Sequence, residues 1–306
     1  MRISLPENDV FTVFLNYSKF SNSVPIRSLY HRSFSHGQPF HWLEAGWENT
    51  ETIVLLHGFM AHSIAYRKIV PKLAARYHLI IPDLPGHGRD LTFQADAVEP
   101  NIAHMVDWLS SLLAAVAAHR GSGHPRRVHL VGHSLSALVA FMWAQDPGAM
   151  DRVKSLTLVS PGVRIGVPGW THHAVERMPF RLAQLGATSL GMRFYEPIQW
   201  RKSRMTSSEV ASYVEPFRDE NRLRFMIDLG ADLLRIPDRL AGAHNIHHRT
   251  LVLWGDRDHL IRRKTVRTLR EGIPDAQMEI FRGVGHCPME DAPDDFWRVL
   301  SNFVSR

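Results

Sequence analysis

The sequence of 306 residues predicts an α/β fold with a mostly parallel sheet and one large helical insertion. Short runs rich in β-branched and aliphatic residues alternate with longer stretches of helical periodicity, which is typical of repeated βα units. Between about residues 163 and 248 this alternation stops. At residues 128–140 an aliphatic run passes directly into an Ala-rich helical pattern through Gly132, His133 and Ser134, which indicates a sharp strand-to-helix turn.

Eight segments have the composition of strands, at residues 26–32, 40–46, 51–58, 77–83, 126–133, 153–160, 249–256 and 276–283. The first two lie close together and predict an antiparallel hairpin. Helical periodicity covers residues 65–77, 101–120, 136–147, 262–273 and 293–305. Each later strand therefore leads to a crossover helix, which is the connection that parallel strands need.

The insertion at residues 163–248 begins in a Gly/Pro-rich passage, from Pro161 to Gly169, and continues as several amphipathic helices. Because it is too long for a plain connection, we expect a helical cap over the carboxyl edge of the sheet, with residues 23–162 and 249–306 as the core. The apolar side chains of the cap either line a ligand pocket or form its own core, and Phe194 and Trp200 are candidates for a lining role. Residues 1–22 form an N-terminal extension of no clear role.

The composition, with 44% apolar and 22% charged residues, is ordinary for a soluble globular enzyme. No stretch approaches the roughly 18 uninterrupted apolar residues of a membrane span, and the N-terminus lacks the pattern of a signal peptide. We therefore expect a cytoplasmic protein without stable membrane insertion. The single cysteine, Cys287, excludes an intramolecular disulfide and a cysteine-rich metal site, and we interpret it as a bystander.

A formal charge of +6 with 19 histidines could attract nucleic acid or acidic membrane surfaces. The basic residues are scattered, however, and the densest group is Arg193, Arg201, Lys202 and Arg204. We interpret this group as a solvated helical face and expect no nucleic-acid partner. Neighbouring histidine pairs have no acidic or cysteine partner at metal-ligand spacing, so we expect neither a metal nor a cofactor.

Ser134 stands at the predicted strand-to-helix turn, where two interpretations compete. A serine in this position can cap the helix N-terminus, or it can be a nucleophile presented to a general base. Ser136 occupies the place where the pattern G-x-S-x-G would have its second glycine. A small side chain should still fit there, and we interpret Ser136 as a packing substitute.

Four separated passages resemble the α/β-hydrolase superfamily in order and spacing. They are LLHGF at 55–59, DLPGHGR at 83–89, VGHSLS at 131–136, and LWGDRDHL at 253–260 together with GVGHCPMEDAP at 283–293. The resemblance implies the α/β-hydrolase fold, with a mostly parallel eight-stranded sheet, helices on both faces and a helical cap. It also implies the chain order nucleophile, acid, base.

The resemblance implies a catalytic triad of Ser134 as nucleophile, Asp258 as acid and His286 as general base. Asp258 is selected over Asp256 because it matches the family's W-G-x-x-D pattern. Asp256 is then a turn-forming or capping residue.

The same resemblance implies an oxyanion hole made by the backbone N–H groups of Phe59 and Leu135. His57 matches a histidine that braces the loop of Phe59. Asp83 and Gly86, in the passage DLPGHGR, are expected to be structural.

The leading hypothesis is a cofactor-free serine hydrolase that cleaves a largely apolar carboxylic ester or thioester through an acyl-enzyme. Carbon–carbon bond hydrolysis of the meta-cleavage or β-diketone type is the alternative within enzymes. Epoxide hydrolases and haloalkane dehalogenases of this fold use an aspartate nucleophile. Because position 134 is serine, we set these two activities aside. A non-hydrolytic cyclase, lyase or ligand receptor with this fold is the alternative of a different class. The oligomeric state is open.

Overall fold

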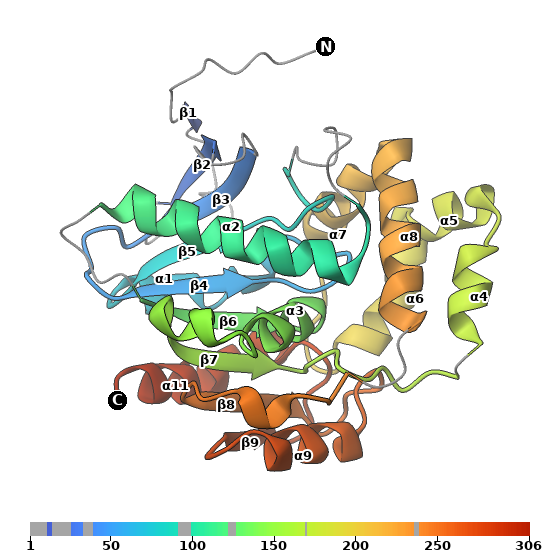
Figure 1. The fold of residues 1–306 in the computed structure, drawn as a ribbon. Helices are drawn as coiled ribbons and strands as arrows, with labels where there is room; N and C mark the ends of the chain where they lie inside the picture. Colours follow the sequence, from blue (N-terminus) through green and yellow to red (C-terminus); the bar gives the residue numbers. More distant parts are fainter. Residues whose placement is uncertain are drawn as a thin grey trace.

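The computed structural model describes residues 11–13, 26–32, 39–90, 99–121, 127–168, 170–235 and 239–306. The described residues form one sheet of nine strands with helices packed on both faces (Figure 1). The strands are β1 (Phe11–Val13), β2 (Ile26–Arg32), β3 (Pro39–Ala45), β4 (Thr52–Leu56), β5 (His78–Pro82), β6 (Val128–His133), β7 (Val153–Val159), β8 (Thr250–Gly255) and β9 (Gln277–Phe281).

The strand order is β1-β2-β3-β5-β4-β6-β7-β8-β9. The pairs from β5 to β9 are all parallel, and the pairs β1–β2, β2–β3 and β3–β5 are antiparallel. The eight predicted strands and the predicted hairpin are therefore present. The ninth strand, β1, falls in the segment 1–22 to which the sequence assigned no role; residues 1–10 and 14–22 lie outside the described residues.

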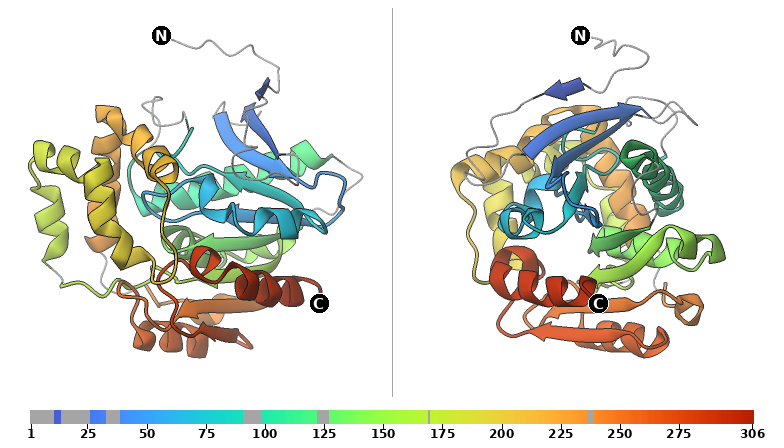
Figure 2. Two further views of the ribbon diagram at one scale, coloured as in Figure 1. Left: turned by 180° about the vertical axis from the view of Figure 1, so that it is seen from behind. Right: turned by 90° about the vertical axis from the view of Figure 1, so that its left-hand side faces the viewer.

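Side chains of the central strands alternate between two hydrophobic clusters, one on each face of the sheet. On β4, Val54 and Leu56 belong to one cluster, while Ile53 and Leu55 belong to the other. The helices α2 (Ile102–Arg120) and α3 (Leu135–Trp143) cover the first face. The helices α1 (Val70–Ala74) and α11 (Pro293–Val304) cover the second, as the two views in Figure 2 show. Burial on both faces explains why these strands read as continuous aliphatic runs.

Four of the five predicted core helices have bounds close to those expected; α9 (Arg263–Gly272) is among them. The exception is the helix expected at residues 65–77, which is a short 3₁₀ turn, η2 (Ser63–Tyr66), followed by α1. Pro71 lies in the first turn of α1. Proline lacks an N–H group and is tolerated there but not in a helix interior, so one continuous helix cannot form across this position.

Of the described helices, only α2 is long and apolar enough to cross a membrane by those two criteria alone. It packs against α3. Its apolar side chains, among them Trp108, Leu109 and Leu112, are buried in the core cluster. Burial in the core accounts for the apolar composition of α2.

The insertion between β7 and β8, which we call the cap, is helical in its described residues. It holds α4 (Thr171–Glu176), α5 (Phe180–Gly186), α6 (Ser189–Gln199), α7 (Ser207–Val214) and α8 (Glu220–Arg235), with the short 3₁₀ helices η5 (Glu215–Arg218) and η6 (Ala243–Asn245). These α-helices gather at one end of the sheet in Figures 1 and 2. Helix α8 reaches the loops after β4 and β5, because a Cβ on Gly230 would lie 3.1 Å from the Phe59 ring and Gly86 lies against Phe225 and Met226.

Candidate active site

The turn between β6 and α3 holds Ser134 in an unusual backbone conformation, with φ of 54° and ψ of −110°. Positive φ is rare for residues other than glycine and is typical of functional turns. Ser134 is the N-cap of α3 by position, yet its side chain makes no capping hydrogen bond. The capping interpretation of this serine therefore has no support in the geometry.

The sharpness of this turn follows from the close approach of α3 to β6. A Cβ on Gly132 would lie 2.6 Å from the Ser136 carbonyl oxygen and 2.9 Å from the Ala137 Cα. Any side chain at position 132 would therefore push the helix away from the strand. The absence of a side chain at Gly132 lets α3 start this close to β6, and Ser134 makes the turn between the strand and the helix.

Ser136 is fully buried, and its hydroxyl donates a hydrogen bond to the His57 carbonyl oxygen. The hydroxyl thus connects α3 to the loop that follows β4. Its burial fits the interpretation of Ser136 as a packing residue, and the hydrogen bond adds a bracing role that the sequence pattern did not indicate.

Two backbone N–H groups beside Ser134 have no acceptor among the described residues, those of Phe59 and Leu135. The Gly58 carbonyl accepts from His57 Nδ1 at 2.9 Å and from the Ala61 N–H at 3.2 Å. Because N–H and C=O point in opposite directions across a trans peptide, these bonds turn the Phe59 N–H the other way. Close contact adds proximity, since a Cβ on Gly58 would lie 3.1 Å from the Ser134 Cβ.

The Leu135 N–H is oriented by the same principle. The Ser134 carbonyl accepts hydrogen bonds from the Leu138 N–H at 3.1 Å and the Gly162 N–H at 3.0 Å. The Leu135 N–H therefore points away from both, and it is the first N–H of α3, where helices leave N–H groups unpaired. Two oriented donors next to one serine can stabilise an oxyanion.

Asp258 and His286 form a buried hydrogen-bonded pair, with 2.8 Å between the Asp258 Oδ2 and the His286 Nδ1. The other oxygen of Asp258 accepts from the backbone N–H groups of Leu260 and Ile261, at 2.8 and 3.0 Å. Burial opposes ionisation of this carboxyl, but His286 and the two N–H groups outweigh it and lower its pKa. A carboxylate on Nδ1 leaves Nε2 of His286 available as a proton acceptor.

Asp256, the other acid after β8, lies in a different environment. It is exposed, and its Oδ1 accepts from the Gly283 N–H at 2.6 Å. This bond makes it a turn residue that joins the loops after β8 and β9. The two acids are therefore distinguished by their partners, and only Asp258 contacts His286.

The backbone of His286 is held from two sides by residues that the sequence patterns did not single out. The His133 Nε2 lies 2.9 Å from the His286 carbonyl oxygen, and the two rings are 4.9 Å apart between centroids. The His286 N–H donates to the carbonyl of Gln199, at the end of α6, at 2.9 Å. Burial lowers the pKa of His133 to about 3, so its neutral ring donates through Nε2.

His133 also relates the nucleophile to the base, because it neighbours Ser134 in the chain and contacts His286 directly. The Ser134 hydroxyl makes no hydrogen bond to His286 or to another residue of the described part of the chain. Hydrogen bonds between nucleophile and base are often long in the absence of substrate. Four core loops thus converge here: those after β4, β6 and β8, and the loop after β9 that carries His286.

The model of the alpha/beta hydrolase family matches residues 53–299. The chain belongs to this family. It is thus an enzyme, a hydrolase, and the fold that the sequence motifs imply is confirmed.

This hydrolase is similar along most of its length to three proteins whose names describe an activity. It is 24% identical to lipase 3 of Moraxella sp. (strain TA144), covering 92% of this chain and 85% of that protein. It is 28% identical to the pimeloyl-[acyl-carrier protein] methyl ester esterase of Chromobacterium violaceum, covering 82% and 93%. The structure of the 2-hydroxy-6-oxo-6-phenylhexa-2,4-dienoate hydrolase of Rhodococcus sp. strain RHA1 superposes with a TM-score of 0.75 at 21% identity, covering 92% and 100%.

In this hydrolase Asp291 links the loop of His286 to the cap by hydrogen bonds. Its carboxylate accepts four backbone N–H bonds, from Arg201, Lys202, Ser203 and Gly285, at 2.8 to 3.1 Å. Three of these donors follow α6 in the cap, and the fourth directly precedes His286. One buried side chain therefore fixes the position of the base relative to the cap.

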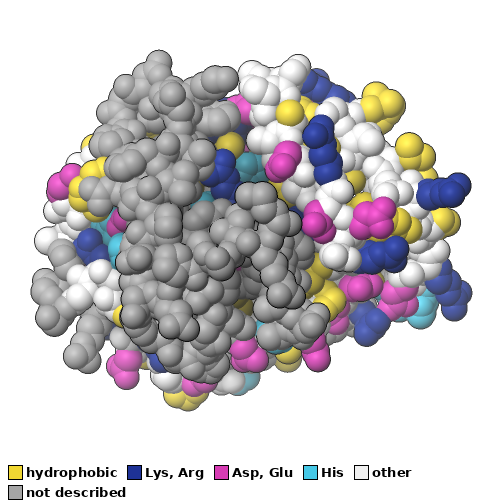
Figure 3. Space-filling model, turned by 90° about the horizontal axis from the view of Figure 1, so that it is seen from above, with side chains coloured by type: hydrophobic (Ala, Val, Ile, Leu, Met, Phe, Trp, Pro, Cys, Tyr) yellow, Lys and Arg dark blue, Asp and Glu magenta, His cyan; other side chains and the backbone are white. Residues whose placement is uncertain are grey.

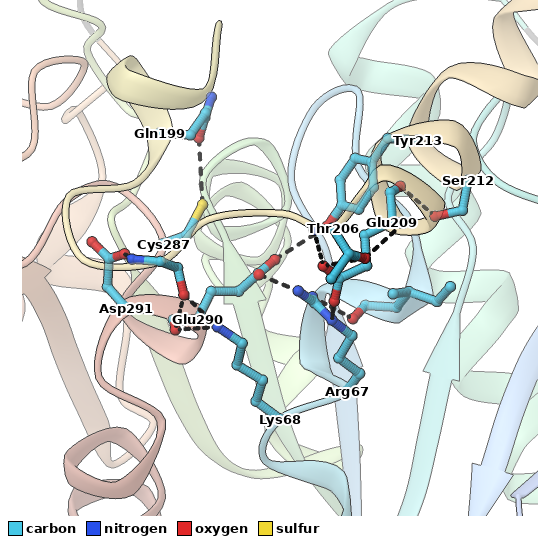
Figure 4. A network of polar contacts seen from close by, with 12 residues as sticks. Arg67, Lys68, Gln199, Thr206, Glu209, Ser212, Tyr213, Cys287, Glu290 and Asp291 are labelled. Carbon is cyan, nitrogen blue, oxygen red and sulfur yellow. Dashed lines mark hydrogen bonds and ion pairs between the residues drawn. The ribbon is translucent and has the colours of Figure 1, made fainter. Parts of the chain in front are cut away.

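Neighbouring charges extend this attachment, as Figure 4 shows. Arg67, after η2, pairs with Glu209 of α7 and with the buried Glu290, at 2.9 Å from the latter. Tyr213 donates to Glu290 at 3.2 Å. Burial raises the pKa of Glu290, and Arg67 opposes that shift. Lys68 adds contacts to Ser203 and to the Glu290 carbonyl.

The remaining family motifs are structural in the hydrolase. Asp83 is buried and accepts from the N–H groups of Ser63 and Arg89 and from the His41 Nδ1, at 2.7 to 2.9 Å. Burial opposes its ionisation, but the hydrogen bond from His41 and the neighbouring rings of His62 and His57 hold its pKa low. His57 is also buried, and its Nε2 accepts from the Leu84 N–H at 3.0 Å. These bonds tie the loops after β4 and β5 together.

Two further predictions concern single residues. Cys287 is buried, and burial raises the pKa of its thiol well above the usual value, so it is not an activated nucleophile. Phe194 is 76% exposed, so the expectation that it lines a pocket is wrong; it lies on the outer side of α6. Trp200 is buried and packs edge-on against Tyr213. Among the described residues no cluster of His, Cys, Asp and Glu side chains could hold a metal ion.

Proposed function

We propose that this hydrolase cleaves a carboxylic ester or thioester through an acyl-enzyme on Ser134. The observation that carries the proposal is the placement of two unpaired N–H groups, of Phe59 and Leu135, beside a serine on a strained turn. Such donors stabilise negative charge on a carbonyl oxygen as a nucleophile adds to it. The buried pair of Asp258 and His286 supplies the base.

In the first half-reaction the Ser134 Oγ attacks the substrate carbonyl while the His286 Nε2 takes the hydroxyl proton. Asp258 accepts a hydrogen bond from the Nδ1–H of His286 and stabilises the imidazolium. The carbonyl oxygen becomes an oxyanion between the two N–H groups. As the tetrahedral intermediate collapses, the bond to the leaving alcohol or thiol breaks, and His286 returns the proton to that group.

In the second half-reaction a water molecule attacks the acyl-enzyme, and His286 accepts its proton. The second tetrahedral intermediate collapses to a carboxylic acid, and the proton on His286 returns to the Ser134 Oγ. No cofactor or electron donor enters this sequence.

Ester cleavage is favoured over carbon–carbon cleavage by the relatives that cover most of the chain, since their names are lipase and methyl ester esterase. The dienoate hydrolase shares the fold at 21% identity, which supports fold and not reaction. We further propose that the acyl group is largely apolar, because the cap helices bring apolar side chains such as those of Phe225 and Met226 against the loop at Gly86.

The test uses a fluorophosphonate probe followed by mass spectrometry, with turnover of a short-chain p-nitrophenyl ester measured in parallel. We expect the probe on Ser134 only, and loss of both labelling and turnover in Ser134→Ala. Ser136→Ala is the matched control and should remain labelled. Labelling of Ser136 with Ser134 untouched would overturn the assignment, and labelling of Ser134 without turnover of any ester or thioester would overturn the reaction.

A further inference from the structure

Large apolar side chains protrude from one part of the hydrolase. Eight large hydrophobic residues are exposed among the described residues, and seven of them lie between positions 167 and 198. We call these seven the outer apolar face: Val167, Trp170, Leu182, Leu185, Leu190, Phe194 and Ile198. Large exposed apolar side chains that gather in one segment are unusual, and exposed apolar patches often mark sites of interaction.

Helix α6 shows that this exposure is built into the helix. Leu190, Phe194 and Ile198 follow one another at intervals of four residues and therefore form a single stripe, which faces outward. The buried side of the helix holds Met192, Glu196 and Gln199. A helix that serves only the core would bury its apolar side chains, whereas α6 also exposes a second apolar stripe.

The rotation of α6 is fixed by polar contacts on its buried side. Arg193, which pairs with Glu196 within α6, donates to the Met205 carbonyl beyond the helix at 2.8 Å, and the Gln199 carbonyl accepts from the His286 N–H. Turning the stripe inward would break both contacts. Helix α5 adds Leu182 and Leu185 on its exposed side, and it adjoins α6 closely, since a Cβ on Gly191 would lie 2.2 Å from the Gly186 carbonyl oxygen.

Positive charge is concentrated in the same segment. Residues 163–205 hold seven Lys or Arg residues against two Glu residues, a formal charge of +5 in a chain whose total is +6. Both glutamates are paired with arginine, Glu176 with Arg235 and Glu196 with Arg193. Figure 3 shows hydrophobic and basic side chains, with several acidic ones among them, along its right-hand side, the end where α4 and α5 lie in Figure 1.

We propose that the outer apolar face binds an anionic lipid surface. Its Trp, Phe and Leu side chains enter the boundary between headgroups and acyl chains, while the surrounding arginines contact lipid phosphates. The chemistry selects this occupant over a second copy of the chain, because that copy would bring together two segments 163–205, each with a formal charge of +5. The proposed attachment is peripheral, through the outer apolar face.

This surface connects to the active site through one helix, because α6 carries the stripe and ends at Gln199, which holds His286. A bound hydrolase would therefore keep its site close to the lipid surface. The proposal of lipid binding does not depend on the proposed reaction, because binding is measured in a protein that does not turn over substrate.

The experiment is co-sedimentation of the full-length Ser134→Ala protein with phosphatidylcholine vesicles, with and without phosphatidylglycerol. We expect binding that requires phosphatidylglycerol and weakens as salt is raised. Phe194→Ser combined with Leu190→Ser should reduce the partition coefficient at least about tenfold, since each side chain transfers substantial apolar area. Arg177→Gln and Arg181→Gln should each reduce it about fivefold.

Met150→Ser is the matched control, because Met150 is the one exposed large hydrophobic residue outside the face in the part of the chain that the structure describes, and this variant should bind as the parent does. The face substitutions, placed in the active protein, should leave turnover of a water-soluble short-chain ester unchanged, which shows that they fold. Equal binding by the face variant and its parent would overturn the proposal. A parent protein that ignores anionic vesicles but forms a dimer, or binds an acidic protein through Phe194, would assign the face to that partner instead.

Discussion

The two halves of the cap differ in how they are held. The first half, α4 and α5, buries almost nothing: α4 has no buried residue, and α5 has only Ala183. The second half begins where α6 ends and is fastened to the core by the polar contacts of Gln199, Asp291 and Arg67. Its helix α8 buries eight residues.

This difference separates two tasks within one insertion. The fastened half contacts the loop of His286, so its position affects the geometry of the proposed base. The first half contributes little to the core, so its sequence is free to serve a surface. Substitutions in the two halves should therefore have different consequences, and the following expectations test that division.

The largest effect should come from the core itself. Asp258→Asn should reduce kcat by a factor on the order of 10³ to 10⁴, because an amide cannot hold the imidazole in its productive tautomer or stabilise imidazolium. Asp256→Asn is the matched control and should have far less effect, since the Asp256 carboxylate accepts from the Gly283 N–H and, unlike Asp258, has no hydrogen bond to His286. Steady-state kinetics of both variants checks this, and the reverse ranking would move the acid to Asp256.

In the fastened half, Asp291→Asn should reduce the rate of fluorophosphonate labelling of Ser134 by about 10- to 100-fold. Each oxygen of Asp291 accepts two N–H bonds, so an amide NH₂ in either orientation would face two donors and displace the His286 loop. Asp294→Asn, at an exposed carboxylate paired with Lys72, should label normally.

A folded Asp291→Asn protein that labels at the normal rate would show that the attachment only stabilises the fold. A shift in the acidic limb of the pH profile for labelling would instead support a role in positioning His286.

Acid should also destabilise the contact between α7 of the cap and the core. Burial lowers the pKa of His62 to about 4, and His62 lies against Ser212 and Tyr213 of α7. The unfolded chain protonates this histidine below pH about 6.5 while the folded state keeps it neutral, so the free energy of unfolding falls as the pH drops from about 6.5 to about 4. The fall is at most about 1.4 kcal/mol per pH unit for one such histidine.

Urea unfolding at several pH values measures this fall. His62→Gln should make the dependence shallower by about one proton. An unchanged slope in that variant would exclude His62 as a source of acid sensitivity.

The smallest effect should come from Ser136→Gly, with activity within about tenfold of the parent. The substitution removes the hydrogen bond to the His57 carbonyl but restores the glycine of the G-x-S-x-G pattern at this position. A kinetic assay beside Ser134→Ala checks it. A loss as deep as in that variant would mean that Ser136 takes part in the chemistry.

Local patterns were enough to predict eight of the nine described strands, four of the core helices and the family, because strand alternation and short loop motifs are encoded by neighbouring residues. The choice of Asp258 over Asp256 followed from a motif, and its contact with His286 agrees with that choice. Phe194 shows the limit, because helical periodicity identifies a stripe without indicating whether the stripe faces the core or solvent.

The residues that hold the backbone of His286 in position were not predicted, for a related reason. His133 and Gln199 contact it across 153 and 87 positions of the chain, and no sequence spacing signals such contacts. Asp291 reaches the cap across about 90 positions. The short strand β1 was missed because three residues are too few for a recognisable alternation.

The positive φ of Ser134 has a consequence for heat resistance. A backbone held in a sparsely populated region costs about 1 to 3 kcal/mol, which glycine largely avoids. Ser134→Gly should therefore give an inactive protein that melts at a higher temperature than the parent, whereas Ser134→Ala keeps a Cβ and should not gain in this way. Calorimetry of the three proteins would measure how much stability the hydrolase gives up in order to present its serine.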